Sequence, residues 1–113
     1  MIILARSSCC WSSHRRCVIA TVDFGTTDVP TAGTRVQISA SLLQVKAIEL
    51  HARSGNTGAM YGGVSDVTST NGRELRPGEV LVLDFGEGSV PFNVFWLDTA
   101  TNGNDMDWVV VLV

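Results

Sequence analysis

The chain has 113 residues, of which 45% are hydrophobic and only 17% charged. Its formal net charge of −3 gives no overall basic field for nucleic acid, and no stretch approaches the roughly 20 apolar residues of a membrane span. The length predicts one domain, and a chain so short and so apolar is expected to bury surface against partners.

The charge is unevenly distributed along the chain. The first seventeen residues hold Arg6, Arg15 and Arg16 and no acid, whereas the remainder holds five basic and all eleven acidic residues. Trp11 lies within the same basic segment. We therefore predict an N-terminal arm over residues 1–17, ahead of an acidic body, with these four residues as a latch on a neighbouring subunit.

The three cysteines all fall in the arm, at Cys9, Cys10 and Cys17. A disulfide framework for the body is therefore not expected. Together with His14 they could supply soft ligands for zinc, but their spacing fits none of the usual zinc motifs. We expect incidental thiols and no metal site.

From residue 18 onward, short β-branched and apolar runs alternate with turn residues, which is typical of strands. We expect strands at residues 18–22, 34–39, 45–52, 59–61, 79–85, 90–97 and 108–113. Between them stand Gly- and Asn-rich turn signals such as Pro77-Gly78 and Asn102-Gly103. Seven to eight strands with turns every 8 to 12 residues predict a single antiparallel β-sandwich or jelly roll over 18–113.

Alternation within these runs predicts which side chains face the core. In 45–52 we expect Ile48, Leu50 and Ala52 inside, with Glu49, His51 and Arg53 outside. The run 79–85 is expected to be buried on both faces.

The last two runs, 90–97 and 108–113, are also expected to be buried. In 90–97 the alternation places Phe92, Val94 and Trp96 in the core. The closing run 108–113 is apolar throughout, so it is expected to be central in its sheet or covered by another subunit.

The sequence contains few candidates for catalytic residues. The sequence holds no Gly-x-Ser-x-Gly elbow, and of the two histidines His51 alternates with Glu49 on an exposed strand face, where an ion pair is the ordinary interpretation. We predict no catalytic residues and no cofactor.

One loop contains oxygen ligands of the kind that calcium takes, but without EF-hand spacing, so a solvated acidic loop is the favoured alternative. The residues of this loop are Asp98, Asn102, Asn104, Asp105 and Asp107.

From about residue 45 onward, turns and strands follow one another in a distinctive order. The features are the strand 45–50, Asn56-Thr57-Gly58 leading into Met60-Tyr61-Gly62, Val67, Asn71-Gly72, Leu75, Pro77-Gly78-Glu79, the run 80–83, the aromatic strand Val94-Phe95-Trp96 and the closing apolar strand. In this order of turns and strands, which covers about 70 of 113 residues, the sequence resembles small structural proteins of tailed bacteriophages.

The resemblance implies a β-sandwich virion component, namely a capsid cement or decoration protein on the capsid exterior. It implies trimers or other small homo-oligomers that bridge major capsid subunits. A tail, spike or head-fibre component is an alternative with the same pattern. A carbohydrate- or ligand-binding sandwich is another, which would use Tyr61 or Trp96 as a stacking platform. We expect neither a membrane nor a nucleic acid as partner.

Overall fold

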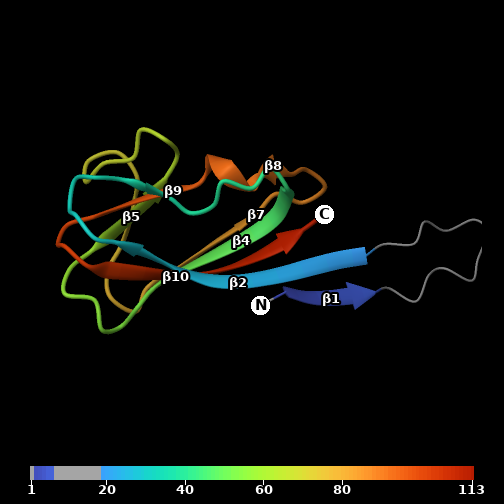
Figure 1. Cartoon of the computed structure of the whole chain (residues 1–113), viewed down its shortest axis with the longest axis horizontal. Coiled ribbons are helices and arrows are strands. Elements are labelled where there is room, and N and C mark those ends of the chain that lie inside the picture. Colours follow the sequence, from blue (N-terminus) through green and yellow to red (C-terminus); the bar gives the residue numbers. More distant parts are fainter. Residues whose placement is uncertain (1, 7–18) are drawn as a thin grey trace, which may run out of the picture.

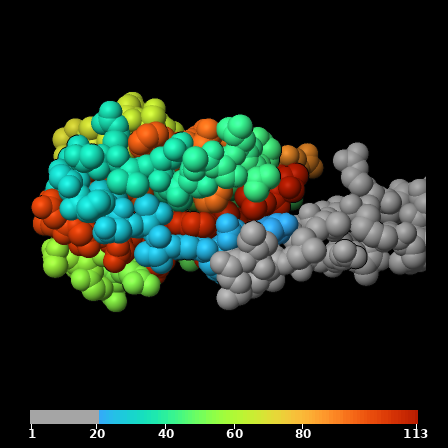
Figure 2. Space-filling view, in the orientation of Figure 1, coloured from blue at the N-terminus to red at the C-terminus, as the bar shows by residue number. Residues whose placement is uncertain are grey.

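The computed structural model describes residues 2–6 and 19–113, which form two antiparallel sheets packed face to face (Figure 1). The fold is therefore all-β and a sandwich, as the sequence predicted. Antiparallel pairing suits this chain because each strand can bury one face while the other meets solvent. In Figure 2 the connection from β2 to β4, coloured teal, lies along the upper part of the visible surface.

The larger sheet, called sheet A, contains the long strands. Its order is β1-β2-β10-β4-β7, and the short β8 pairs with the end of β4. The strands are β1 (Ile2–Arg6), β2 (Ile19–Val29), β10 (Asn104–Leu112), β4 (Gln44–Ala52), β7 (Val80–Asp84) and β8 (Val90–Pro91).

The smaller sheet, called sheet B, packs on the inner face of sheet A. Its order is β3-β9-β5-β6, and a 3-10 turn, η1, connects β8 to β9. The elements are β3 (Val36–Gln37), β9 (Trp96–Thr99), β5 (Met60–Gly63), β6 (Arg73–Leu75) and η1 (Phe92–Val94).

The core lies between the sheets and draws on every long strand. Ile48 and Leu50 of β4 are buried there, as predicted, together with Met106 and Val110 of β10. Leu97 of β9 and Met60 of β5 close the core from sheet B and are fully buried. The predicted phase of 45–52 is confirmed, because Glu49 is exposed while its neighbours along the chain are buried.

The closing strand occupies the position predicted for it. β10 lies between β2 and β4, with Val110 opposite both Asp23 and Ile48 (Figure 1). Trp108 of β10 rests over Gly25 of β2, where a Cβ atom would overlap the indole ring. The indole donates to Thr27 Oγ1 at 3.1 Å and meets Phe92 edge-on, with ring centroids 5.2 Å apart.

The prediction for 79–85 is wrong. β7 is the last strand of sheet A rather than a doubly buried one, and the side chains of Val80 and Val82 are 50% and 60% exposed. An unbroken apolar run does not distinguish a central strand from an edge strand, because only the neighbours that pair with it decide its burial.

The prediction of one alternating strand over 90–97 is also wrong. The 3-10 turn η1 interrupts it, so Phe92, Phe95 and Leu97 face the core and Trp96 lies half-buried on the outer side of sheet B. Pro91 accounts for the interruption of the strand, since proline lacks the N–H that a continuing ladder needs. The turn shifts the phase of every side chain after it.

The predicted arm is described only in part. Residues 2–6 form β1, which pairs with β2 through Ile2 opposite Asp23 and Arg6 opposite Ile19. The rest of the segment 1–17 lies outside the described residues, so the division into arm and body stays a prediction.

Candidate functional site

The solvent-facing side of sheet A is the candidate site. Residues directly opposite in antiparallel strands share a face, so the register defines rows that cross β2, β10, β4 and β7. One row runs Phe24, Val109, Glu49, Val82, and the next runs Val22, Val111, Ala47, Asp84. A third row runs Thr26, Asp107, His51, Val80.

The first two rows make this face mainly apolar. Phe24 is 38% exposed and Val82 is 60% exposed, while Val109 between them is half-buried. A hollow of about 200 Å³ sits in the middle of the face, lined chiefly by Ala47, Glu49, Val82, Val109 and Val111. We call these residues, with Val22 and Phe24, the apolar face.

A single carboxylate stands in the centre of the apolar face. Glu49 is exposed, lies between Val109 and Val82 across the sheet, and makes no ion pair or side-chain hydrogen bond with any described residue. The sequence had suggested a pair between Glu49 and His51, and the structure pairs His51 with Asp107 instead. Glu49 is therefore available to a basic group from a partner.

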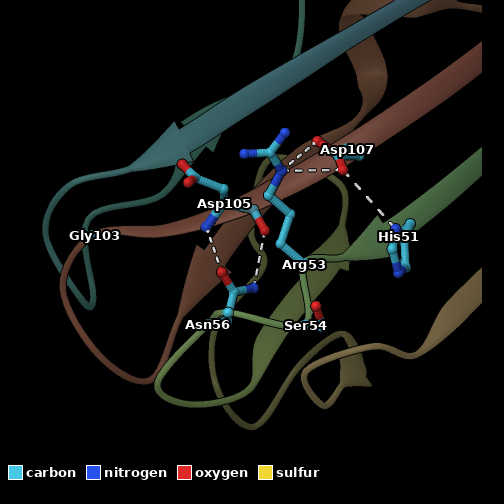
Figure 3. Close-up of a pocket in the computed structure, with 8 residues that line it drawn as sticks. His51, Arg53, Ser54, Asn56, Gly103, Asp105 and Asp107 are labelled. Atoms are coloured by element: carbon cyan, nitrogen blue, oxygen red, sulfur yellow. Dashed lines mark hydrogen bonds and ion pairs between the residues drawn. The ribbon is translucent and has the colours of Figure 1, made fainter.

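The third row contains a polar cluster around Asp107 (Figure 3). Arg53 Nε donates to both carboxylate oxygens, at 3.0 and 3.1 Å, and Thr26 Oγ1 donates to Oδ1 at 2.5 Å. The Nδ1 atom of His51 lies 3.9 Å from Oδ2. Side chains from β2, from β4 and from Arg53 just after β4 thus converge on one acid of β10.

These contacts determine the acidity of Asp107. Partial burial by itself raises the pKa of this carboxyl, but hydrogen bonds from Thr26 and Arg53 and the charges of Arg53 and His51 outweigh it. The pKa of Asp107 therefore lies below its ordinary value of 3.8. Asp107 is ionised at neutral pH and anchors β10 to both neighbouring strands.

A shallow pocket of about 430 Å³ adjoins this cluster at the end of the sheet. Asn56 crosses its floor, donating through Nδ2 to the carbonyl of Asp105 and accepting from the Asp105 amide, both at 2.9 Å (Figure 3). Ser54 lines the pocket, yet among the described residues no hydrogen bond connects it to His51. The polar groups are engaged with one another, which is the arrangement of a structural ion-pair cluster.

The oxygen-rich loop considered for calcium is used internally. Asp98 is 3% exposed and accepts from the amides of Gly33 and Thr99, at 3.0 and 2.8 Å. Asn104 is 2% exposed and accepts from the Thr57 amide while donating to the Gly58 carbonyl. Within residues 2–6 and 19–113, no three His, Cys, Asp or Glu side chains gather as metal ligands would.

Of the four arm residues predicted to bind a partner, the structure describes only Arg6. Arg6 ends β1, and Trp11, Arg15 and Arg16 lie outside the described residues, as do Cys9, Cys10, His14 and Cys17. The described part of the chain has no helix long and apolar enough to cross a membrane. No protein-family model and no curated protein matches the sequence.

Sequence reasoning missed the apolar face, although a signal for it was present. The run 108–112 of β10 is apolar at both inward and outward positions, and the sequence predicted that it would be central in its sheet or covered by another subunit, without identifying the residues that share its outer face. Phe24 lies in a stretch of Thr, Asp and Gly that has no clear strand pattern, so β2 was expected to end at residue 22. Its extension to Val29 brings Phe24 beside Val109.

Proposed function

We propose that this chain is a structural protein that binds other protein subunits through the apolar face of sheet A. The observation that carries the proposal is the set of apolar side chains, on four adjacent strands, that face solvent rather than the core. Contiguous exposed apolar surface on a folded domain marks protein interaction sites. A central charge such as Glu49 adds selectivity, because it leaves an unpaired carboxylate in any complex that lacks a basic partner.

The partner that we propose is the major capsid protein of a tailed phage. The chain would act as a capsid cement or decoration protein on the outside of the virion. Support comes from the resemblance of residues 45–113 to small phage structural proteins, together with a rigid sandwich that offers a broad face. A ligand that binds only the assembled shell stabilises that state by a free energy that grows with the logarithm of the ratio of its concentration to its Kd.

The basic arm would add a second contact in this proposal. Arg6, Arg15 and Arg16 can pair with carboxylates of a neighbouring subunit, and Trp11 can fill a pocket there. Two linked contacts bind more tightly than either alone, since the second becomes intramolecular.

The test is co-sedimentation of the purified full chain with intact heads of the phage that encodes it, and with unassembled capsid subunits. We expect binding to heads and none to free subunits. Phe24→Lys should weaken binding at least about tenfold, because it places a charge in the apolar face. Leu42→Lys is the matched control, since Leu42 is 72% exposed and outside this face.

Failure to bind heads would exclude the capsid role. Binding to purified tails or fibres instead would assign the chain to a tail, spike or head-fibre component. The arm contributes if replacing Arg15 and Arg16 with Ala lowers affinity and leaves the melting temperature unchanged.

One observation favours a carbohydrate-binding module as the second candidate. Tyr61 and Trp96 are diagonal neighbours on the outer side of sheet B, because Tyr61 pairs with Asp98 and Trp96 with Gly63. Both rings are half-buried rather than fully exposed, which limits the platform available for stacking. Glycan-array binding that is lost in Trp96→Ala and kept in Phe24→Lys would favour this candidate over the capsid role.

A further inference from the structure

The free edge of sheet A offers backbone hydrogen-bonding groups that the capsid proposal does not use. β7 pairs with β4 on one side, and among the described residues no strand pairs with its other side. The Phe85 amide donates to the Lys46 carbonyl, and the Ala52 amide donates to the Glu79 carbonyl. Antiparallel bonding alternates, so the backbone groups of Val80, Val82 and Asp84 point away from β4.

The side chains along this edge are unusually apolar. Val80 and Val82 are 50% and 60% exposed on the outer face, and Leu83 is 36% exposed on the inner one. Proteins protect solvent-exposed edge strands with lysine, proline, inward charges or bulges. β7 has none of these, since its sequence is Val-Leu-Val-Leu-Asp and its register to β4 has no shift.

A cleft beneath β7 also opens at this edge. It holds about 170 Å³ and lies between β7 and sheet B, with a lining that is apolar except for Arg73. Its apolar walls are Leu50, Val64, Leu81, Leu83 and Phe95, with backbone at Gly62 and Gly63. Val64 is itself 53% exposed. A strand added to β7 would cover both the outer valines and this cleft.

We propose that β7 pairs antiparallel with β7 of a second copy, about a two-fold axis at Val82. In this register Val82 faces its own counterpart, and Val80 faces the second copy's Asp84. All the outward backbone N–H and C=O groups of the three residues then find partners across the axis. On the inner side Leu81 meets the second copy's Leu83, which closes the two clefts on each other.

The distribution of charge favours a second copy as the occupant. Asp84 is the only charged residue of β7, and this register places it opposite a valine and not opposite another acid. Strand direction also puts the end that carries Asp84 and Glu87 beside the end that follows Arg76, where the other charged residue, Glu79, accepts a hydrogen bond from the Arg76 amide. The two Glu49 carboxylates lie three strand spacings apart, roughly 14 Å, beyond the screening length at physiological salt.

The shared axis also makes the two sheets continuous. The row Phe24, Val109, Glu49, Val82 runs on into the same row of the second copy in reverse order. The sheet formed in this way leaves β7 no open edge, which removes the hazard that its sequence creates.

Light scattering on the purified full chain across a range of concentrations is the first test. We expect a dimer with twice the 12.1 kDa mass of one chain. Val82→Lys places two ammonium groups at the axis and should weaken dimerisation at least about a hundredfold, while Leu42→Lys should not change it. Val82 is exposed, so the variant should fold, which an unchanged circular dichroism spectrum would verify.

A cysteine scan tests the register in a background with Cys9, Cys10 and Cys17 replaced by Ser. Directly opposite residues in a hydrogen-bonded antiparallel pair have Cα atoms about 5.5 Å apart, within the range for a disulfide. Val82→Cys should therefore crosslink to itself under oxidation. Asp84→Cys alone and Leu42→Cys should not, whereas a mixture of Val80→Cys and Asp84→Cys chains should form the mixed dimer.

Several results would overturn the proposal. A monomer at all concentrations would do so, as would a dimer or trimer that Val82→Lys leaves intact. A Val82→Lys-sensitive dimer in which Val82→Cys fails to crosslink would exclude this register. None of these results bears on capsid binding, because every measurement is made without capsid protein, and the head-binding test uses Phe24 on a different strand.

Discussion

β7 and β10 contain nearly the same run of side chains, yet one lies at an edge and the other at the centre of the same sheet. β7 reads Val-Leu-Val-Leu at 80–83, and β10 reads Val-Val-Val-Leu at 109–112. In β10, Val110 and Leu112 are buried between two pairing strands, whereas Leu83 of β7, in the same inward-facing row as Val110, is 36% exposed. Composition alone thus fails to assign position, because burial depends on which strands pair on each side.

The two strands also differ in what holds them. β10 is anchored at three points along its length, by the buried Asn104, by Asp107 and by Trp108 over Gly25. β7 has ladder bonds to β4 alone and turns at its two ends. Three substitutions test this difference, in order of expected effect.

The largest effect is expected from a charge in the centre of β10. Val110→Asp buries an unpaired carboxylate at a position that is 0% exposed, and should destabilise the fold by about 4 kcal/mol or more. Leu83→Asp is the matched change in β7, because Leu83 lies in the same inward-facing row as Val110 but is 36% exposed, and it should cost less than about 2 kcal/mol when the protein is dilute. Urea denaturation of both variants provides the measurement. Similar losses in the two strands would contradict the assignment of β7 to the edge.

A smaller effect is expected where β2 and β10 approach most closely. Gly25→Ala drives a methyl group into the indole of Trp108, and should cost about 1–3 kcal/mol through forced repacking. Gly55→Ala is the control, because nothing lies within 4 Å of its added Cβ. Thermal melts of both variants, followed by tryptophan fluorescence, would report the difference. An unchanged melting temperature in Gly25→Ala would contradict the packing of Trp108 over this glycine.

The smallest effect is expected at Asp107 and depends on pH. Its side chain is 33% exposed, so Asp107→Asn should cost only about 1 kcal/mol at neutral pH. Because the folded-state pKa is lowered, the carboxylate contributes its full stability above the ordinary value of 3.8, and this contribution is lost as the pH falls through the lower folded pKa. Wild type and variant should therefore converge in stability toward pH 2.

Melting temperatures between pH 2 and 7 would check this convergence. Asp66→Asn is a suitable control, since the Asp66 carboxylate is exposed and makes no hydrogen bond or ion pair with the described residues. A constant gap between wild type and Asp107→Asn down to pH 2 would show that the effect is steric and not electrostatic.

The sequence by itself determined the all-β class, most of the strands and the phase of β4. These features depend on local chemistry, namely β-branched alternation and turn residues such as Gly78 and Gly103, which adopt φ values of 87° and 80° that glycine tolerates. It also anticipated that the closing strand needs cover, because an open apolar strand of that kind would aggregate. For the candidate site it identified the outward positions of Glu49, His51 and Arg53 but not their partners.

Only the tertiary structure decided which apolar run lies at the edge, where the strand over 90–97 breaks, and which acid meets His51. Asp107 is 56 residues from His51 along the chain, and Phe24 is 85 residues from Val109. The apolar face arises from pairing between such distant segments, and a strand's own residues do not specify its neighbours. Sheet order and register result from the packing of the whole chain, which no local pattern contains.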